Sequence, residues 1–301
     1  MEKVKFIWLD GKFVNWERAN IHILSHCLHY GSGAFEGIRC YQTDNGPAVF
    51  RLKDHLKRLF SSAKVLKIKI PFSPSYLQQA IIALLKKNKV EEGYIRPIVF
   101  YGYGKMGLDP TGAKISTALA VWRWGKYLQD AVRAKISKYI RIHPQSVVVS
   151  AKICGYYINS ILATFDAKDK GYDEAILLDY RGMVAEGPGE NIFIVKNKRL
   201  YTPKLISILP GITRDSVIKI AKDLGINFQE KDISVKELKN ADEAFFTGTA
   251  AEITPIIQID NKLINKGKIG EITNLLKERF NNIIRGRVPK YKNWLTYFKI
   301  K

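Results

Sequence analysis

The 301-residue sequence predicts an α+β fold made of two domains. Runs in which apolar and polar residues alternate like strands occur along the whole chain, and segments with helical periodicity lie between them. Around Gly125 this pattern stops, and polar residues follow, which is typical of a connector. We therefore expect a small α/β domain over residues 1–121, a connector over 122–131 and a larger domain over 132–301.

The first domain should begin with a hairpin over residues 6–14, because Asp10-Gly11 is a favoured two-residue hairpin turn. A helix is expected over 52–63. A second helix should begin after Ser73, which can cap it, with Pro74 at its first position. Further strands are expected at 48–51, 94–101 and 115–124.

The larger domain should also mix both element types. Alternation predicts a strand over 132–142, and strand-like runs recur at 174–179 and 191–195. Helices are expected over 213–224, over roughly 269–284, and over 234–239, where a Ser-x-x-Glu pattern forms a capping box. This succession of elements is typical of α+β proteins.

Composition is that of an ordinary globular chain. The hydrophobic content is 46%, and no run approaches the roughly eighteen apolar residues that a membrane span needs. The first ten residues lack the apolar core and cleavage site of a signal peptide. Three cysteines without metal or redox spacing fit a reducing compartment. We expect a cytoplasmic protein without a membrane partner.

The net charge of +21 favours an alternative class, a basic nucleic-acid-binding protein without catalysis. No acidic residue occurs between Asp130 and Asp166, and the tail 285–301 has six Lys or Arg and no acid. Neither tract contains a nucleic-acid-binding motif, so we expect no nucleic-acid partner. Abundant Lys and Ile with only three Met and three Cys suggest a thermophilic source.

Lys152 is the most informative residue, because it stands in the apolar stretch 147–159. Burial disfavours an ammonium, so desolvation would lower the pKa of this lysine and leave part of it as a free amine that can attack a carbonyl. The alternative is a surface lysine whose stem covers apolar atoms while its ammonium stays in water. Sequence position alone leaves both interpretations open.

The segment around Lys152 resembles the lysine segment of the branched-chain aminotransferases, which are class IV pyridoxal-phosphate enzymes. The likeness continues in order over nearly the whole chain, through blocks such as Phe35-Glu-Gly-Ile-Arg39, Tyr94-Ile-Arg-Pro97 and Thr247-Gly-Thr-Ala-Ala251. The other matching blocks lie at 26–34, 50–59, 104–109, 185–193, 209–215 and 291–295.

The resemblance implies a two-domain fold whose larger domain is β-barrel-like, and a pyridoxal 5′-phosphate cofactor. Lys152 would be the catalytic base and would hold the cofactor as a Schiff base. Glu186 would pair with the ring nitrogen, and Tyr157 would bond the phenolic oxygen. Phosphate-binding positions would be Arg58 and Thr249, together with Gly211, Ile212 and Thr213 at a helix start.

The implied activity is reversible amino transfer from L-leucine, L-isoleucine or L-valine to 2-oxoglutarate by a ping-pong mechanism. Arg96 and Tyr30 would take the acidic end of glutamate. Tyr94 and the amides of Thr249 and Ala250 would bind the α-carboxylate. The remaining substrate candidates are Phe35, Gly37, Met106, Leu108, Trp124 and Tyr127.

Similar enzymes are homodimers or larger homo-oligomers in which the segments bearing Tyr30 and Met106 reach across the dimer interface. D-amino-acid aminotransferases and aminodeoxychorismate lyases share the lysine, glutamate and phosphate machinery and are the alternatives within class IV. Leu108 departs from the commoner family residue, which puts the side-chain preference in doubt. His22, His26, His29 and Cys27 lack a second ligand set, so we expect no metal.

Overall fold

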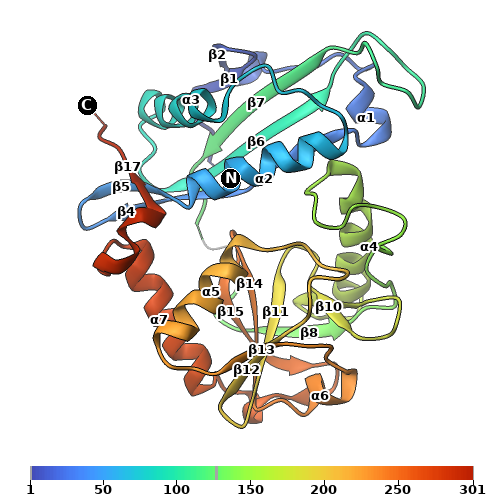
Figure 1. Ribbon diagram of the computed structural model, residues 1–301, viewed down its shortest axis with the longest axis vertical. Helices are drawn as coiled ribbons and strands as arrows, with labels where there is room; N and C mark the ends of the chain where they lie inside the picture. Colours follow the sequence, from blue (N-terminus) through green and yellow to red (C-terminus); the bar gives the residue numbers. More distant parts are fainter. Residues whose placement is uncertain (1, 126–127, 301) are drawn as a thin grey trace. The chain divides into compact units, whose positions relative to one another are not determined.

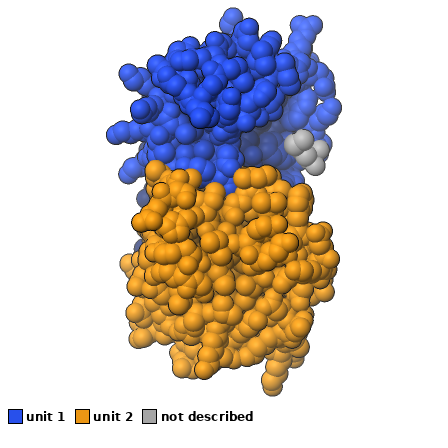
Figure 2. Space-filling model, turned by 90° about the vertical axis from the view of Figure 1, so that its right-hand side faces the viewer, with its two compact units in different colours: residues 1–125, 151–156, 283–301 blue, residues 126–150, 157–282 orange. Residues whose placement is uncertain are grey.

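The computed structural model describes residues 2–125 and 128–300 (Figure 1). The chain forms two compact units, which are coloured separately in Figure 2. Unit 1 contains residues 1–125, 151–156 and 283–301, and unit 2 contains 126–150 and 157–282. The α+β class predicted from the sequence is confirmed.

The units are discontinuous in sequence, unlike the predicted ranges 1–121 and 132–301. Two segments that the sequence assigned to the larger domain belong to unit 1, because strand pairing joins them to it. Ile153 bridges Ala34, and the carboxy-terminal strand β17 (Leu295–Tyr297) pairs with β5 (Gly46–Phe50). Part of the predicted connector, residues 126–127, lies outside the described residues.

Unit 1 is built on one sheet with the strand order β17-β5-β4-β6-β7-β1-β2, with β3 added against β6. The remaining strands are β1 (Phe6–Leu9), β2 (Lys12–Asn15), β3 (Gly33–Phe35), β4 (Ile38–Thr43), β6 (Gly93–Tyr101) and β7 (Ile115–Trp122). The predicted hairpin is confirmed as β1–β2. Its turn residues Asp10 and Gly11 have φ values of 46° and 92°, as the Asp-Gly signal requires.

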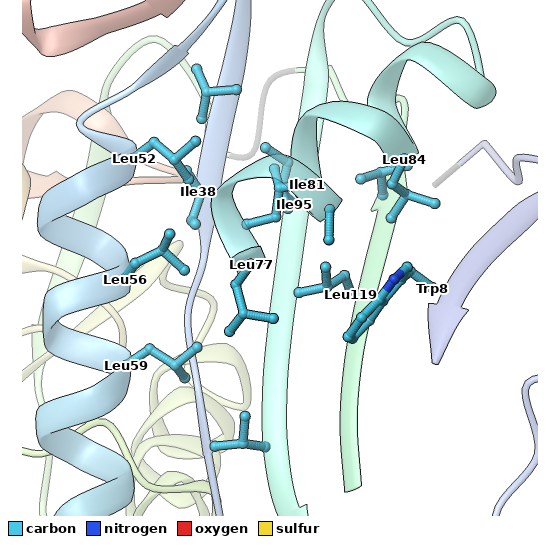
Figure 3. Packing of buried hydrophobic residues seen from close by; sticks show 14 of the residues in the cluster. Trp8, Ile38, Leu52, Leu56, Leu59, Leu77, Ile81, Leu84, Ile95 and Leu119 are labelled. Carbon is cyan, nitrogen blue, oxygen red and sulfur yellow. The ribbon is translucent and has the colours of Figure 1, made fainter. Parts of the chain in front are cut away.

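Helices α2 (Leu52–Val65) and α3 (Pro74–Lys87) pack against this sheet. Figure 3 shows Leu56 of α2 and Leu77 of α3 directed toward the strands that carry Ile95 and Leu119. The buried leucines and isoleucine of each helix repeat at helical spacing, at Leu52, Leu56 and Leu59 in α2 and at Leu77, Ile81 and Leu84 in α3, so the apolar face of each helix is removed from water. Ser73 accepts a hydrogen bond from the Tyr76 N–H, which confirms the predicted cap.

Unit 2 contains a closed, barrel-like sheet, as the family resemblance predicted. Its strands follow the order β10-β9-β8-β15-β14-β11, and β11 pairs back with β10. The bounds are β8 (Val132–Ile136), β9 (Glu174–Leu178), β10 (Val184–Glu186), β11 (Asn191–Lys196), β14 (Glu243–Gly248) and β15 (Glu252–Ile259). Strands β12 (Arg199–Thr202), β13 (Phe228–Glu230) and β16 (Lys262–Leu263) extend the sheet.

The strand predicted over 132–142 is wrong in its second half, because β8 ends at Ile136. Ser137 Oγ accepts a hydrogen bond from the Tyr139 N–H at 3.1 Å, and this local turn competes with strand pairing. Beyond the turn, the chain carries Arg141 into the interior of unit 2.

The helices of unit 2 agree with the sequence prediction at three places. They are α5 (Ile212–Asp223), α6 (Val235–Lys239) with its complete Ser234–Glu237 capping box, and α7 (Glu271–Ile284). Helix α4 (Tyr157–Lys168) was not predicted. The short elements α1 (His26–Tyr30), η1 (Trp16–Arg18), η2 (Cys154–Tyr156), η3 (Asn265–Gly267) and η4 (Pro289–Trp294) complete the chain. Across residues 2–125 and 128–300, no helix has both the length and the apolar character needed to span a bilayer.

Candidate functional site

Lys152 lies in unit 1 beside strand β3, where backbone pairing fixes its position. Its carbonyl accepts a hydrogen bond from the Phe35 N–H at 3.1 Å, and its own N–H donates to Ser62 Oγ at 2.9 Å. The side chain is half-buried, and its ammonium lies 5.0 Å from the centroid of the Phe35 ring. Hydrogen bonds thus hold the backbone of Lys152 in place, while its half-buried side chain keeps some access to solvent.

An aromatic cluster surrounds Arg96 in the same unit. The guanidinium carbon lies 4.8 Å from the Phe35 ring centroid, 5.4 Å from that of Tyr94 and 6.0 Å from that of Trp122. Arg96 Nη2 donates to the Tyr94 hydroxyl at 3.4 Å, whereas its buried Nε has no hydrogen-bond partner among the described residues. A cation stacked among aromatic faces in this way can bind an anion at its edge and apolar groups along its walls.

Gly37 is required by the position of Tyr94. A Cβ at residue 37 would lie 1.8 Å from the Tyr94 hydroxyl oxygen, and only a residue without a side chain fits there. Trp124 packs against Tyr94 in a T-shaped arrangement, with ring centroids 4.8 Å apart. The structure thus brings together the predicted residues Phe35, Gly37, Tyr94, Arg96 and Trp124.

Arg58 is held by a buried carboxylate that the sequence did not indicate. Arg58 Nε and Nη2 donate to the two oxygens of Glu36 at 2.6 and 2.9 Å, and His55 Nδ1 bonds the same carboxylate at 2.8 Å. Although burial opposes ionisation of Glu36, Arg58 and His55 together hold the pKa of this carboxyl well below its usual range. Burial lowers the pKa of His55. The guanidinium of Arg58 is therefore fixed in orientation.

Three predicted substrate residues remain at the surface of unit 1. Tyr30, Met106 and Leu108 are 44%, 40% and 87% exposed. Tyr30 and Leu108 line a hollow of about 980 Å³ together with Ile153 and Tyr156. Tyr127 lies outside the described residues.

In unit 2, Glu186 is buried at the end of β10 and is held by three donors. Arg141 Nε donates to it at 2.7 Å, Asn191 Nδ2 at 3.0 Å, and the Leu209 N–H at 3.2 Å. Asn159 Oδ1 accepts from Arg141 Nη1 at 3.2 Å and so braces the arginine. These three donors keep the Glu186 carboxylate in one place.

Three of the predicted phosphate residues, Gly211, Ile212 and Thr213, lie at the start of α5. Gly211 is the N-cap residue, and no side chain caps the helix, so a bound anion can use the first N–H groups. A Cβ at Gly211 would lie 1.9 Å from Asn191 Oδ1, which shows that this turn packs directly on the Glu186 network. Tyr157 is the first residue of α4, and Thr249 and Ala250 lie half-buried in the turn between β14 and β15.

These features fit a phosphorylated, ring-containing cofactor. The uncapped start of α5 suits a phosphate, and a fixed carboxylate suits a protonated ring nitrogen. In the same unit, the buried hydroxyls of Thr247 and Ser207 have no hydrogen-bond partner among residues 2–125 and 128–300, which leaves donors for a ligand.

The histidines near Cys27 are engaged in local bonds. His26 bonds Ser32 Oγ at 2.6 Å and the Gly107 carbonyl at 2.7 Å, and His29 bonds the Ile23 carbonyl at 2.9 Å. Within the described part of the chain, no group of three or more His, Cys, Asp or Glu side chains could hold a metal ion.

Comparison with known proteins assigns the family. The model of the family "Amino-transferase class IV" matches residues 33–259, which is most of the chain. The protein belongs to the class IV aminotransferases.

Three relatives of this class IV aminotransferase are full-length matches. The branched-chain-amino-acid aminotransferase of Pseudomonas aeruginosa is 43% identical over 97% of both chains. The crystal structure of the Escherichia coli branched-chain amino acid aminotransferase is 40% identical, covers 98% of this chain and 99% of the other, and has a TM-score of 0.96. The branched-chain amino acid aminotransferase of Thermobaculum terrenum, solved in its pyridoxal-phosphate form, is 33% identical over 98% of this chain and 99% of the other, with a TM-score of 0.93.

The sequence analysis missed the residues that position Arg58 and Glu186. Glu36 and His55 in unit 1, and Arg141 and Asn159 in unit 2, were not predicted as site residues. A signal existed for His55, because it lies three residues before Arg58 and such spacing places both on one helix face. Arg141 stood in the long acid-free tract, and its acidic partner Glu186 is 45 residues away in sequence.

Proposed function

We propose that this protein is a branched-chain amino acid transaminase that uses pyridoxal 5′-phosphate. It transfers the amino group of L-leucine, L-isoleucine or L-valine reversibly to 2-oxoglutarate in a ping-pong reaction. The proposal rests on the full-length similarity to branched-chain aminotransferases and on one structural observation, the environment of Arg96.

The Arg96 cluster suits an enzyme that must accept two different side chains. A branched aliphatic group can pack on Phe35 and Tyr94, because their rings present apolar faces. The carboxylate of glutamate can instead bond the Arg96 guanidinium, whose buried Nε has no hydrogen-bond partner among the described residues. One cluster therefore serves both half-reactions.

Several predicted residues are candidates to hold the cofactor. Pyridoxal phosphate, when bound, supplies an aldehyde that captures amines and a ring that withdraws electrons from the substrate's α-carbon. Arg58, Gly211, Ile212, Thr213 and Thr249 would bind its phosphate. Glu186 would bond the ring nitrogen, and Tyr157 the phenolic oxygen.

Lys152 would act twice. Its amine would be the group that holds the cofactor through the aldehyde carbon. The same amine, in its free form, would take the proton from the substrate's α-carbon as a general base. Tyr94 and the amides of Thr249 and Ala250 would orient the substrate by its α-carboxylate.

The test is the variant Lys152→Ala, compared with Lys138→Ala. Lys138 is a fair control because its ammonium also lies over an aromatic ring, 5.1 Å from the centroid of Tyr139. Loss of the base should lower turnover of L-leucine with 2-oxoglutarate by about 10²–10⁴-fold or more. It should also abolish the visible absorption that wild type shows with pyridoxal phosphate, while the control keeps both. Wild-type turnover in Lys152→Ala, or turnover of D-alanine in place of L-leucine, would refute the proposal.

The active form is proposed to be a homodimer or a larger homo-oligomer. On α4, the side chains of Ile158, Ile161, Leu162 and Phe165 repeat at helical spacing and are all exposed, at 37–60%. On unit 1, Leu28 and Leu108 are exposed as well. Exposed apolar surface of this kind is typical of subunit interfaces. A second copy that covers Leu108 would also receive Met106 and Tyr30 near its own substrate. The expected result is a molecular mass in solution of at least twice 34.3 kDa.

We place the enzyme in the cytoplasm of a thermophilic organism. All three cysteines are free thiols, which suits a reducing compartment. Ion pairs link many charged side chains, as where Arg181 bonds both the buried Asp179 and the partly exposed Asp232, and networks of paired charges lose less stability on heating.

A further inference from the structure

Two cysteines that are far apart in sequence lie together in unit 1. Cys27 is on α1, and Cys154 begins η2, two residues after Lys152. Because Ala34 pairs with Ile153 in antiparallel register, Gly33 stands opposite Cys154. A Cβ at Gly33 would lie 2.9 Å from Cys27 Sγ and 3.2 Å from Cys154 Sγ. Both sulfur atoms thus fill the space left by the missing side chain, and they hydrogen-bond to each other.

The backbone holds the two cysteines in this position. The Gly155 N–H donates to the Gly31 carbonyl at 3.1 Å, and the Gly31 N–H donates to the Cys27 carbonyl at 2.9 Å. Gly31 has a φ of 65°, and a Cβ there would lie 2.5 Å from the Cα of Gly155. The turn after Cys27 and the turn after Cys154 therefore touch through their backbones, which leaves the thiols facing each other.

The two thiols differ in acidity. The hydrogen bond from Cys154 lowers the pKa of Cys27, although burial acts in the opposite direction. The same bond, with burial, raises the pKa of Cys154. Cys154 is therefore the proton donor of the pair, and Cys27 is the sulfur that ionises first and attacks as a thiolate.

Cys40 provides an internal reference. It is fully buried on β4, where burial raises its pKa, and its Sγ donates to the Glu91 carbonyl at 3.2 Å. Cys27 and Cys154 are only half-buried. A small oxidant should thus reach the pair before it reaches Cys40.

We propose that Cys27 and Cys154 form a reversible disulfide, with Cys27 as the attacking thiol and Cys154 as the resolving thiol. Cys27 attacks one oxygen of hydrogen peroxide, which breaks the O–O bond, gives Cys27 a sulfenic acid and releases one water. Cys154 sulfur then attacks the Cys27 sulfur, which forms the S–S bond and expels the hydroxyl as a second water. The two thiols lose two electrons in total, the peroxide is reduced, and an added dithiol reverses the change.

The disulfide would tie the lysine-bearing segment to α1. It closes a loop of more than a hundred residues, which restricts the unfolded chain. The oxidised protein should consequently melt at a higher temperature than the reduced one, whether or not the protein is a transaminase.

The experiment treats the full-length protein with hydrogen peroxide and reads its intact mass, its free thiols after denaturation, and its melting temperature. Wild type and Cys40→Ser should lose two thiols and two hydrogen masses, melt at a higher temperature, and recover with dithiothreitol. Cys154→Ser should lack the crosslink and accumulate a sulfenic acid on Cys27 that dimedone captures. Cys27→Ser should lack both the crosslink and the dimedone adduct.

Three results would overturn the proposal. Wild type could keep all three thiols under peroxide, the crosslink could disappear in Cys40→Ser, or dimedone could label Cys154 in Cys27→Ser as strongly as it labels Cys27 in Cys154→Ser. None of these readouts depends on amino transfer, so they separate failure of this inference from failure of the proposed function.

Discussion

Each unit contains a buried glutamate that is hydrogen-bonded to an arginine. In unit 1 the glutamate orients the arginine, whereas in unit 2 the arginine orients the glutamate. Glu36 in unit 1 accepts from Arg58 Nε at 2.6 Å, and Glu186 in unit 2 accepts from Arg141 Nε at 2.7 Å. Both carboxylates are at least nine-tenths buried. The pairs are alike in bond length and burial, but their other partners differ.

The partners of Glu36 come from one helix face, since His55 and Arg58 are three residues apart on α2. The two oxygens of Glu36 are occupied by them, so this carboxylate serves to orient a cation. Glu186 instead receives donors from separate segments, at Arg141, Asn191 and the Leu209 N–H. In unit 2, Arg141 therefore orients the Glu186 carboxylate.

The comparison teaches which charge each unit offers to a ligand. Unit 1 presents a fixed guanidinium, which suits a phosphate, and unit 2 presents a fixed carboxylate, which suits a cationic ring nitrogen. Substitutions that remove charge but keep shape should therefore have different effects in the two units.

The largest effect should come from Glu186→Gln. The amide keeps the size of the side chain but loses the charge that would stabilise a protonated ring nitrogen. Removal of one such preorganised electrostatic partner costs on the order of 10²–10³ in kcat. We expect that loss with L-leucine, measured under saturating pyridoxal phosphate, with little change in cofactor affinity.

Glu174→Gln is the matched control, because Glu174 is equally buried in unit 2 but accepts a hydrogen bond from the adjacent Ala175 N–H. If both variants kept wild-type kcat, Glu186 would have no electrostatic role in the reaction.

Glu36→Gln should have a smaller effect, and on binding. The neutral amide offers one acceptor where the carboxylate offers two, so Arg58 and His55 lose a charge-assisted hydrogen bond worth about 1.5–3 kcal/mol. If Arg58 binds the cofactor phosphate, the Kd for pyridoxal phosphate should rise about 10- to 100-fold, as measured by fluorescence titration. The value of kcat at saturating cofactor should change little.

Glu92→Gln is the control in unit 1, since Glu92 pairs with Arg285 at 2.6 Å but is 37% exposed. Equal cofactor affinity in Glu36→Gln and wild type would show that the orientation of Arg58 does not affect phosphate binding.

The sequence predicted the elements that local rules determine. The Asp10-Gly11 turn, the Ser73 cap and the Ser234–Glu237 capping box each depend on residues within a few positions of one another, and all three are confirmed. The start of α5 after Gly211 was also correct to within one residue. These features need no tertiary information.

Partners that are distant in sequence could not be predicted by such rules. Glu36 and Arg58 are separated by 22 residues and Arg141 and Glu186 by 45, and no periodicity links the members of either pair. The membership of 151–156 and 283–301 in unit 1 likewise depends on strand pairings with Ala34 and β5. Family resemblance supplied the ligand-facing candidates, whereas the residues that hold them became visible only in the fold.

The smallest expected effect concerns pH and isolates the unit 1 pair. Burial lowers the pKa of His55 in the folded protein below the ordinary 6.5. Below pH 6.5, the unfolded chain therefore binds a proton that the folded chain does not, and stability falls as the pH drops toward the folded pKa. The slope can reach about 1.4 kcal/mol per pH unit. His55→Asn keeps a donor near the position of Nδ1 but does not titrate, so urea unfolding between pH 7.5 and 5.5 should show a weaker loss of stability than in wild type. The donors around Glu186 include no histidine, so Arg141 and its partners cannot produce this difference. Identical pH dependence in the two proteins would mean that the Glu36–His55 bond persists in both protonation states of the imidazole.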